Sequence, residues 1–318
     1  MTIKAQLINL ANLARVRQYY KNGLIFFALF FSKKLLYTDY YFSFIVGFIV
    51  LCCTSSINYI INDLKDIKDD KKHSEKIKKK PLASGEISKF TAYLLIIILS
   101  GIVIVFIIFL IPGPNWMFIL MVIMLVITGQ LYNHILKNHA FIDVITLSMG
   151  YLWRALAGSF LIQTQLSPWL FLAIFEIAMF LSIAKRKGDL MILGEKDTAI
   201  AHKKVYNVYT QQILDQLYIM IGASLFITYA IYLIFHFNLD DVSVTYEFYE
   251  YVAIISIPVF LYIIMKYMYL TTTKPEIARN PERAIFDKGI IIAGLILFAI
   301  LAFSYYFDII YELFSRLF

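Results

Sequence analysis

Long apolar runs separated by short polar segments dominate the chain. The run from Thr91 to Ile111 has no charged residue, and about twenty such residues suffice for an α-helix to cross a hydrocarbon core of roughly 30 Å. Backbone groups in lipid must pair within their own segment, so the runs predict helices. We expect about nine spans, near residues 22–37, 40–61, 90–111, 116–135, 141–162, 167–184, 212–236, 250–270 and 289–311. The predicted fold is an all-α polytopic membrane bundle, with residues 1–318 in a single domain.

The composition supports a membrane protein. The 318 residues are 60% hydrophobic and 17% aromatic, and the mean hydropathy is +0.72, whereas a soluble domain is nearer half apolar. The basic first twenty residues lack the compact apolar region of a cleavable signal peptide. Cys52 and Cys53 are adjacent in an apolar run, which indicates membrane-core thiols rather than a disulfide or a metal site.

The positive charges indicate an orientation. With the N-terminus inside, the cytoplasmic segments are the N-terminus, 62–89, 135–140, 185–211 and 266–288, and they hold 25 of the 29 Lys and Arg residues. Positive charge gathers on the cytoplasmic side of membrane proteins, so we expect a cytoplasmic-membrane location with the N-terminus inside and the C-terminus outside. The net charge of +7 suits an anionic leaflet. No nucleic-acid recognition module is present, so nucleic acid is not an expected partner.

An acidic pattern follows the second predicted span. Asn62, Asp63, Asp66 and Asp70 fit N-D-x-x-D-x-x-x-D, and we expect the helix of the span to continue through them. At 100° per residue the three aspartates fall within about 60° of one another. Magnesium, which prefers oxygen ligands and often bridges to phosphate, would relieve their repulsion. The alternative is a solvated helix with i,i+4 charge pairs, which explains the intervening lysines but not the single stripe of carboxylates.

Basic residues follow the aspartates. The stretch KIKKKPLASG, 76–85, offers lysines as donors to phosphate, and Pro81 and Gly85 mark a turn before the third span. Anchoring to the inner leaflet explains each individual lysine equally well.

A second charged cluster follows the sixth predicted span. In SIAKRKGDLMILGEKD, Lys185 and Asp189 are i,i+4 on one helical face, and Arg186 and Lys187 flank Lys185. This group can bind an anion and offer one more carboxylate to a metal, although a basic cap on a membrane helix is the simpler alternative. Because both charged clusters are expected at the cytoplasmic face, we expect one shared cavity there.

Some polar residues lie within the predicted spans, where a charge costs about 2.5–3.5 kcal/mol near the helix centre. Arg154 is a candidate for function or for a structural salt bridge, and Asp143, eleven residues earlier, is placed to line the same cavity. Glu176 is expected to be a packing partner within the bundle. Gln130, Tyr132, Asn133, His134 and Lys137 crowd the cytoplasmic end of the fourth span, where a lone histidine is typical of a hydrogen-bonded interface.

These motifs resemble the UbiA-type intramembrane prenyltransferase superfamily over nearly the whole chain. Several stretches look closest to its decaprenyl-phosphate phosphoribosyltransferase branch: RVRQYYKN (15–22), YIINDLKDIKDDKKH (59–73), PLASG (81–85), LYNHILKNHAFIDV (131–144), RALAGSF (154–160) and AKRKGDL (184–190). The resemblance implies a helical bundle around a cavity that opens to the cytoplasm and to lipid, with Mg²⁺ on a diphosphate leaving group.

The resemblance also assigns residues. Asn62, Asp63, Asp66 and Asp70 match the first metal-binding motif, and Asp189 matches the acid of the second. The second motif is commonly D-x-x-x-D, but this chain has Leu193, which fits the phosphoribosyl branch better than an aromatic prenyltransferase. The resemblance implies substrate-binding roles for a wider set, which comprises Arg17, Lys21, Asn22, Asn62, Tyr132, Lys137, Asp143, Arg154, Lys185 and Arg186.

The expected activity is Mg²⁺-dependent transfer of 5-phosphoribose from phosphoribosyl diphosphate to a polyprenyl phosphate, for lipid-linked pentose in cell-envelope glycan synthesis. The main alternative is a prenyltransferase that joins a prenyl diphosphate to an aromatic or other small acceptor. A secondary transporter is a third interpretation, but transporter sites lie near the midplane rather than on a cytoplasmic helix extension. The polyprenyl length and the oligomeric state stay open.

Overall fold

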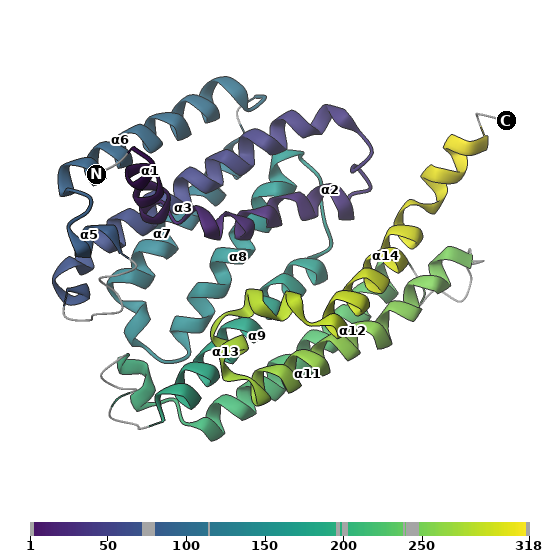
Figure 1. The fold of residues 1–318 in the computed structure, drawn as a ribbon. Helices are drawn as coiled ribbons and strands as arrows, with labels where there is room; N and C mark the ends of the chain where they lie inside the picture. Colours follow the sequence, from purple (N-terminus) through teal and green to yellow (C-terminus); the bar gives the residue numbers. More distant parts are fainter. Residues whose placement is uncertain are drawn as a thin grey trace. The chain divides into compact units, whose positions relative to one another are not determined.

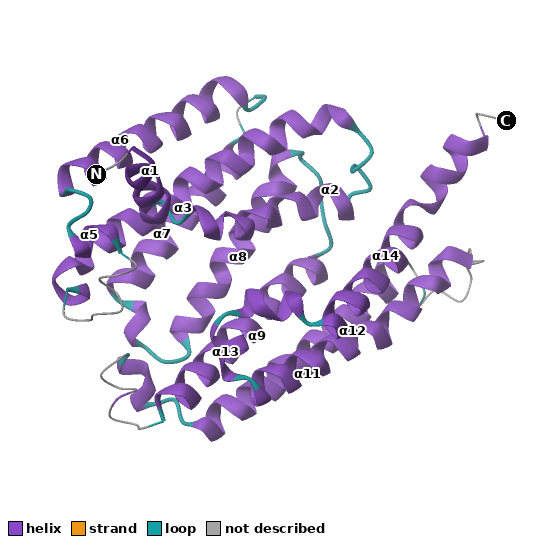
Figure 2. Cartoon of the chain, viewed as in Figure 1, coloured by secondary structure: helices purple, strands orange, loops and turns teal. Residues whose placement is uncertain are grey.

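The computed structural model describes residues 3–71, 80–113, 115–194, 198, 203–237, 239 and 248–315. All the regular structure in these ranges is helical (Figure 2), which confirms the predicted all-α class. Eight helices of the described part are long and apolar enough to cross a membrane. They coincide with eight of the nine predicted spans (Figure 1).

The chain forms two compact units. The first contains Met1–Ile135 and Met149–Gln165, and the second contains Leu136–Ser148 and Leu166–Phe318. The boundary runs through one helix, α8 (Ile142–Leu161), so the first turns of α8 belong to the second unit and the remainder to the first.

The first unit is organised around a long helix, α3, which packs against α6, α7 and η1. Ser88 and Asn115 cap α6 and α7, since their side chains accept hydrogen bonds from the backbone N–H groups of Thr91 and Phe118. The elements of this unit before α8 are α1 (Ile3–Leu13), η1 (Val16–Phe26), α2 (Phe27–Phe31), η2 (Thr38–Tyr40), α3 (Tyr41–Asp70), α5 (Pro81–Ser84), α6 (Lys89–Val105), the π-helical η3 (Phe106–Leu110) and α7 (Trp116–His134).

The first predicted span, 22–37, is wrong as a single membrane helix. The structure has a 3₁₀-helix, η1, followed by the five-residue α2, which ends at Phe31. Lys33, two residues later, has a φ of +59°. A left-handed backbone is unfavourable for a lysine and interrupts an α-helix. Lys34 then donates from Nζ to Thr164 Oγ1 at 2.8 Å. A run of apolar residues therefore did not suffice to predict one regular helix here.

The second unit is built from long helices joined by short ones. Helix α9 packs on α11 and α13, and α12 packs on α14. Pro168 and Pro275 occupy first-turn positions, where the missing N–H costs nothing. The elements are η4 (Leu136–Asn138), the first turns of α8, α9 (Pro168–Leu193), η5 (Lys204–Asn207), α11 (Gln211–His236), α12 (Phe248–Thr273), α13 (Pro275–Arg279), η6 (Pro281–Phe286) and α14 (Lys288–Ser315).

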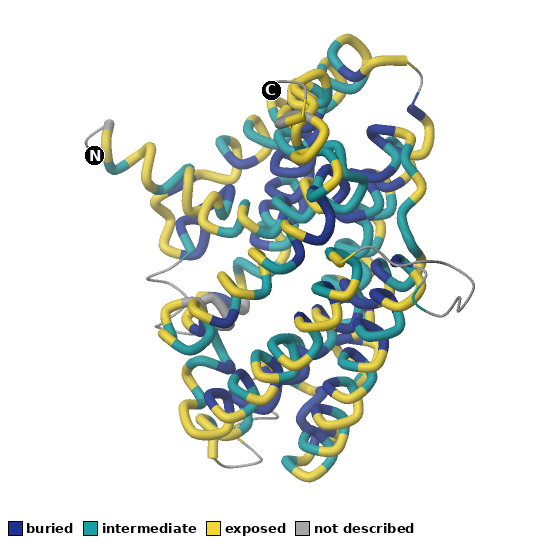
Figure 3. Tube along the Cα trace, turned by 90° about the vertical axis from the view of Figure 1, so that its right-hand side faces the viewer, coloured by how far each residue is buried: buried dark blue, intermediate teal, exposed yellow. Residues whose placement is uncertain are grey.

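Large apolar side chains cover the outside of the long helices. Phe90, Ile97 and Phe109 on α6 and η3 are 77%, 68% and 75% exposed, and none of the most apolar part of this segment is buried. Figure 3 shows exposed positions recurring along the helices of both units. Such a surface is far larger than the apolar patches of soluble proteins, and a bilayer covers it. The chain is a multi-pass integral membrane protein.

Candidate active site

Two carboxylates at the end of α3 bind the same ammonium group. Asp63 and Asp70 are 3% and 2% exposed. Lys80 Nζ lies 3.0 Å from Asp63 Oδ1 and 2.6 Å from Asp70 Oδ2. Residues seven apart lie on one face of a helix, and α3 continues through Asp70 as predicted. The expected placement of these two aspartates on one stripe is therefore confirmed.

The charge of Lys80 is stabilised by its two partners. Burial alone lowers the pKa of the Lys80 ammonium, but the charges of Asp63 and Asp70 and their hydrogen bonds outweigh burial and raise that pKa above its ordinary value of 10.5. Lys80 is thus a fixed cation at neutral pH. It is the lysine of the predicted basic run that the structure describes. The other predicted phosphate donors, at 76, 78 and 79, lie outside the described residues.

A second cation reaches the same oxygen of Asp63. Arg15 Nη2 donates to Asp63 Oδ1 at 2.8 Å, and the Arg15 guanidinium lies 4.5 Å from the centre of the Tyr59 ring. Arg15 adopts a left-handed backbone, with φ 52° and ψ 44°, at the junction of α1 and η1. An arginine rarely adopts this conformation, and strain of this kind is typical of functional sites.

An apolar cluster fixes both cations in place. Leu13 on α1, Ile60 on α3 and Leu82 on α5 are buried in one cluster with Ile87 and Ala92. Arg15 follows Leu13 by two residues, and Lys80 precedes Leu82 by two residues. Packing of α1 and α5 on the end of α3 therefore presents the two cations to Asp63. As predicted, a turn lies here: Pro81 begins α5, and Gly85 ends it at φ 83°.

The other predicted residues of this region are less enclosed. Asn62 and Asp66 are partly buried on α3, and Arg17 is exposed on η1. Lys21 is partly buried and donates from Nζ to Gln18 Oε1 at 3.2 Å. None of these four residues is a partner of Lys80 in the contacts of the described chain.

The carboxylate pair fits a magnesium ion. In the described ranges no three His, Cys, Asp or Glu side chains form a group that would hold a metal, so a cage made of protein ligands alone is not present there. Magnesium is commonly held by one or two carboxylates and completes its shell with water and substrate phosphate. Asp63 and Asp70 supply two hard oxygens that already converge on one positive charge.

A guanidinium lies in the interior of the first unit. Arg154 is 8% exposed; Nε donates to Asn22 Oδ1 at 2.6 Å, Nη1 to Gly150 O at 2.5 Å, and Nη2 to Ser55 Oγ at 3.2 Å. These acceptors are neutral, and no carboxylate within the described residues pairs with Arg154. The structural salt bridge considered for Arg154 is thus not formed among them. Asn22, a predicted substrate residue, is 1% exposed and also donates to Cys52 Sγ at 3.2 Å.

The C-terminal end of α7 is hydrogen-bonded to α3. Gln130 Nε2 donates to Asn58 Oδ1 at 2.7 Å, and Lys65 Nζ lies 2.6 Å from His134 Nδ1. His134 is therefore the hydrogen-bonded interface residue that we expected. Tyr132 in the first unit and Lys137 in the second are both partly buried.

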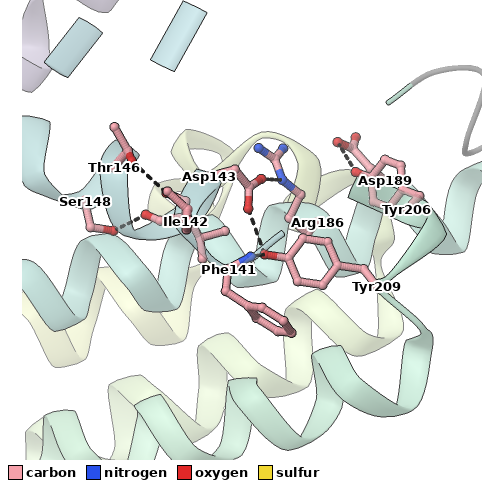
Figure 4. Close-up of polar contacts among 10 residues, drawn as sticks. Phe141, Ile142, Asp143, Thr146, Ser148, Arg186, Asp189, Tyr206 and Tyr209 are labelled. Atoms are coloured by element: carbon pink, nitrogen blue, oxygen red, sulfur yellow. Dashed lines mark hydrogen bonds and ion pairs between the residues drawn. The ribbon is translucent and has the colours of Figure 1, made fainter. Parts of the chain in front are cut away.

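In the second unit, Asp143 forms a buried ion pair (Figure 4). Arg186 Nε donates to Asp143 Oδ2 at 2.8 Å, and the Tyr209 hydroxyl donates to Asp143 Oδ1 at 2.7 Å. Burial and the charge of Asp143 raise the pKa of Tyr209, so Tyr209 stays a neutral donor. The partners of Asp143 in the structure are therefore Arg186 and Tyr209. The predicted cavity shared with Arg154, a residue of the first unit, stays a prediction.

Asp189 is also buried and has two polar partners, Tyr206 and Arg279. It is 4% exposed; the Tyr206 hydroxyl donates to Oδ2 at 3.0 Å (Figure 4), and Arg279 Nε lies 3.2 Å from Oδ1. Burial, followed by the charge of Asp189, raises the pKa of Tyr206. Lys185, expected beside Asp189 on one face, is exposed.

Two further lysines complete the second unit's charged cluster. Lys187 is 6% exposed and its Nζ lies 2.7 Å from Asp215 Oδ1, so it joins α9 to α11 as a structural residue. Lys203 is partly buried. Burial and the positive charge of Arg186 lower the pKa of Lys203 to about 7, against the opposing effect of Asp189.

Sequence reasoning did not single out several of these residues. Tyr206 and Tyr209 stand three apart in KKVYNVYT, and their regular spacing beside two lysines was the available signal. Arg279 and Asp215 carried no local signal, because their partners are distant in sequence. Glu176 was expected as a packing residue, and this is confirmed: Ser224 Oγ donates to Glu176 Oε1 at 2.5 Å.

Comparison with known families identifies the fold. The UbiA prenyltransferase family matches residues 23–285, which is most of the chain and includes both charged clusters. The chain belongs to the UbiA prenyltransferase family. This membership confirms the predicted family and its transferase class.

Two curated relatives that carry the same name are similar to part of this chain. A decaprenyl-phosphate phosphoribosyltransferase of Mycolicibacterium smegmatis is 28% identical over 191 residues, which cover 59% of this chain and 57% of that protein. The protein of the same name from Corynebacterium glutamicum is 24% identical over 187 residues, covering 59% and 55%. The match to this chain thus covers less than two thirds of the length of each of these curated relatives.

Solved structures support the UbiA fold. A UbiA homologue from Archaeoglobus fulgidus bound to dimethylallyl diphosphate (DMAPP) and Mg²⁺ has a TM-score of 0.62 at 15% identity, covering 93% of this chain and 98% of that chain. The same homologue with geranyl diphosphate (GPP) and Mg²⁺ has a TM-score of 0.61, also at 15% identity, covering 93% and 97%. At this identity the likeness establishes the shared fold.

Proposed function

We propose that the protein transfers a 5-phosphoribosyl group from phosphoribosyl diphosphate to a polyprenyl phosphate at the cytoplasmic face of the cell membrane, in a Mg²⁺-dependent reaction. The observation that carries this proposal is the pair Asp63 and Asp70, two buried carboxylates that converge on one cation at the end of a membrane helix. The names of the relatives support the choice of donor and acceptor. The product would serve lipid-linked pentose synthesis for envelope glycans.

The reaction requires stabilisation of a leaving group rather than a strong base. An oxygen of the acceptor phosphate forms a bond to the anomeric carbon, and the bond from that carbon to the diphosphate breaks, with its electron pair leaving on the diphosphate. The acceptor is already anionic, so no proton has to be removed. Mg²⁺, when bound, supplies positive charge where the leaving group becomes negative. Asp63 and Asp70 would hold the ion, and Asn62 and Asp66 on the same helix are its further candidate ligands. Asp189 is a separate candidate metal ligand in the second unit.

The basic side chains are proposed to bind or attract the phosphate groups of the substrates. Arg15 lies against Asp63 at the edge of the proposed diphosphate site. Arg154 binds neutral acceptors only, among the described residues, so its positive charge is available to a phosphate with Asn22 as a companion donor. Arg17, Lys21, Lys137 and Lys185 are proposed as outer donors that attract the soluble sugar phosphate. The polyprenyl tail needs only the apolar surface that the helices already present to lipid.

A reconstituted assay tests the activity. Purified protein in liposomes receives labelled phosphoribosyl diphosphate, polyprenyl phosphate and Mg²⁺, and lipid-extractable label is measured. We expect labelled lipid with the wild type, none with EDTA, and a loss of at least about 100-fold with Asp63→Asn, in keeping with the removal of a group that stabilises a leaving group. Asp39→Asn is the matched control, since Asp39 is exposed in η2 and its replacement leaves the rate unchanged.

The same preparation distinguishes the alternatives. Label from a prenyl diphosphate on an aromatic acceptor, without lipid-linked phosphoribose, would replace this proposal with prenyl transfer. Solute uptake by the liposomes without any turnover would indicate a transporter.

A further inference from the structure

Lys80 occupies the position that a metal ion would take between two carboxylates. Its Nζ bridges Asp63 Oδ1 and Asp70 Oδ2, at 3.0 and 2.6 Å, and both carboxylates are almost completely buried. Two buried carboxylates side by side are unstable without a compensating charge. In this structure the chain itself supplies that charge, from a residue that was only one of many lysines in the sequence.

The fold holds the Lys80 backbone beside the two aspartates, and the Lys80 side chain can reach the surface from there. Lys80 precedes Pro81, the first residue of α5, and has an extended backbone with φ −116° and ψ 106°. Leu82 anchors α5 in the apolar cluster, so the Lys80 backbone is held close to α3. The Lys80 side chain is 20% exposed, compared with 3% and 4% for its partners. A flexible four-carbon stem on a fixed backbone can move its ammonium from the carboxylates to the surface.

Charge balance disfavours Lys80 and a divalent ion in the same place. Arg15 and Lys80 each place a positive charge against these carboxylates, Arg15 at Asp63 and Lys80 at both Asp63 and Asp70. A divalent ion added to this group would meet the Lys80 ammonium within a few ångströms, and like charges repel strongly at that distance in a site with little solvent. If the ammonium leaves, the ion takes over the compensation of the two carboxylates, and the Lys80 ammonium becomes available to an anion beside the ion.

We propose that Lys80 is a built-in countercation of the metal site: it holds Asp63 and Asp70 together before the metal binds, is displaced by the divalent ion, and then becomes a donor to the phosphate that the ion brings. This inference rests on the proposed metal site. It assigns one lysine of the basic run to substrate binding, and it makes metal binding and phosphate binding depend on each other through one side chain.

Metal affinity tests the displacement. Mn²⁺ binding to the purified full chain in nanodiscs is measured by titration calorimetry and by the loss of the free Mn²⁺ spin-resonance signal. Lys80→Met is expected to bind Mn²⁺ about tenfold more tightly than the wild type, because no bound cation has to be displaced. Lys68→Met is the matched control: Lys68 is exposed on the same end of α3, so a general charge effect would appear there too, and we expect a change of less than about twofold for such an exposed charge.

A second measurement uses the wild type alone, so it does not depend on how Lys80→Met folds. Acylation of each lysine is followed by mass spectrometry with and without saturating Mg²⁺. Labelling of Lys80 is expected to rise several-fold when Mg²⁺ binds, while labelling of Lys68 stays constant. Unchanged labelling of Lys80 under conditions where Mn²⁺ binding is demonstrated would overturn the displacement.

The outcomes separate the two proposals. If the wild type binds no Mn²⁺, or binds it equally well after Asp63→Asn, the proposed metal site itself is wrong. If binding depends on Asp63 but Lys80→Met binds Mn²⁺ equally or more weakly, the metal site stands and the countercation role of Lys80 is wrong.

Discussion

Asp143 and Arg186 form an ion pair that is buried on both sides. Their Oδ2 and Nε atoms are 2.8 Å apart, and the side chains are 0% and 2% exposed. Both residues were expected to bind substrate. In the structure, the charge of each is compensated by the other within the second unit. Removal of one partner from such a pair leaves an uncompensated buried charge, whereas replacement of both by apolar side chains also removes the cost of burying them.

Arg186→Met is therefore expected to destabilise the protein by about 3–5 kcal/mol, and the double variant Asp143→Leu with Arg186→Met should recover most of that loss. Unfolding of the detergent-solubilised protein, followed by tryptophan fluorescence, measures both. If Asp143 and Arg186 serve only to stabilise the fold, the double variant regains the stability that the single variant loses. If Arg186→Met keeps wild-type stability and only raises the KM for the sugar phosphate, Arg186 is a binding residue instead.

Gly158 determines how closely η1 approaches α8 in the first unit. A Cβ atom at Gly158 would lie 2.1 Å from the backbone oxygen of Ile25, a contact that no side-chain adjustment relieves. We expect Gly158→Ala to lower stability by about 1–3 kcal/mol through overpacking and to disturb the contact between Arg154 and Asn22. Gly101→Ala is the control, since nothing lies within 4 Å of its Cβ position; it should be neutral or slightly stabilising in a helix. Equal melting temperatures for the two variants would contradict this account.

The sequence predicted the parts of the structure that depend on local periodicity. Eight of the nine spans, the continuation of α3 to Asp70 and the turn at Pro81–Gly85 follow from hydropathy, helical phase and turn chemistry. The prediction of one membrane helix at 22–37 was wrong, because hydropathy does not distinguish an α-helix from an apolar 3₁₀ segment. Here the chain has 3₁₀ geometry and a left-handed Lys33, and Lys34 contacts Thr164, which is distant in sequence.

The partners of the charged residues could not be predicted in the same way. Helical phase placed Asp63 and Asp70 together, but it gave no reason to choose Lys80 over its neighbours as their shared cation. Asp189 pairs with Arg279, ninety positions later, and no periodic signal connects them. Long-range ion pairs depend on how helices pack, so residue types identify the candidates and only the fold selects the pairs.

Arg154 provides a test of phosphate recognition away from the aspartates. Its guanidinium donates to Asn22, Ser55 and Gly150 and has no acidic partner among the described residues. Arg154→Lys retains the charge but loses the planar fork, so we expect the KM for polyprenyl phosphate to rise about tenfold, in line with the loss of one charged hydrogen bond of about 1.5–3 kcal/mol. The KM for phosphoribosyl diphosphate should change less, and steady-state kinetics with each substrate varied in turn measures both. Equal increases in the two KM values would indicate a general distortion of the first unit.

Lys203 should give the second unit a pH-dependent stability. Burial and Arg186 lower its pKa from 10.5 to about 7 in the folded protein. Below pH 7 the amine is protonated in both the folded and the unfolded state, and the folded state bears the full cost of the buried charge. From pH 7 to about 10.5 the folded amine is neutral while the unfolded amine keeps its proton, so stability rises with pH in this window.

Lys203→Met removes the titrating amine and should therefore be more stable than the wild type at pH 6, with a difference that shrinks as the pH rises from 7 to 9. Melting temperatures across this range measure the difference. Lys204→Met is the matched control, because Lys204 is the exposed neighbour of Lys203, and its difference from the wild type should not vary with pH. A constant difference for Lys203→Met as well would mean that the amine is charged throughout.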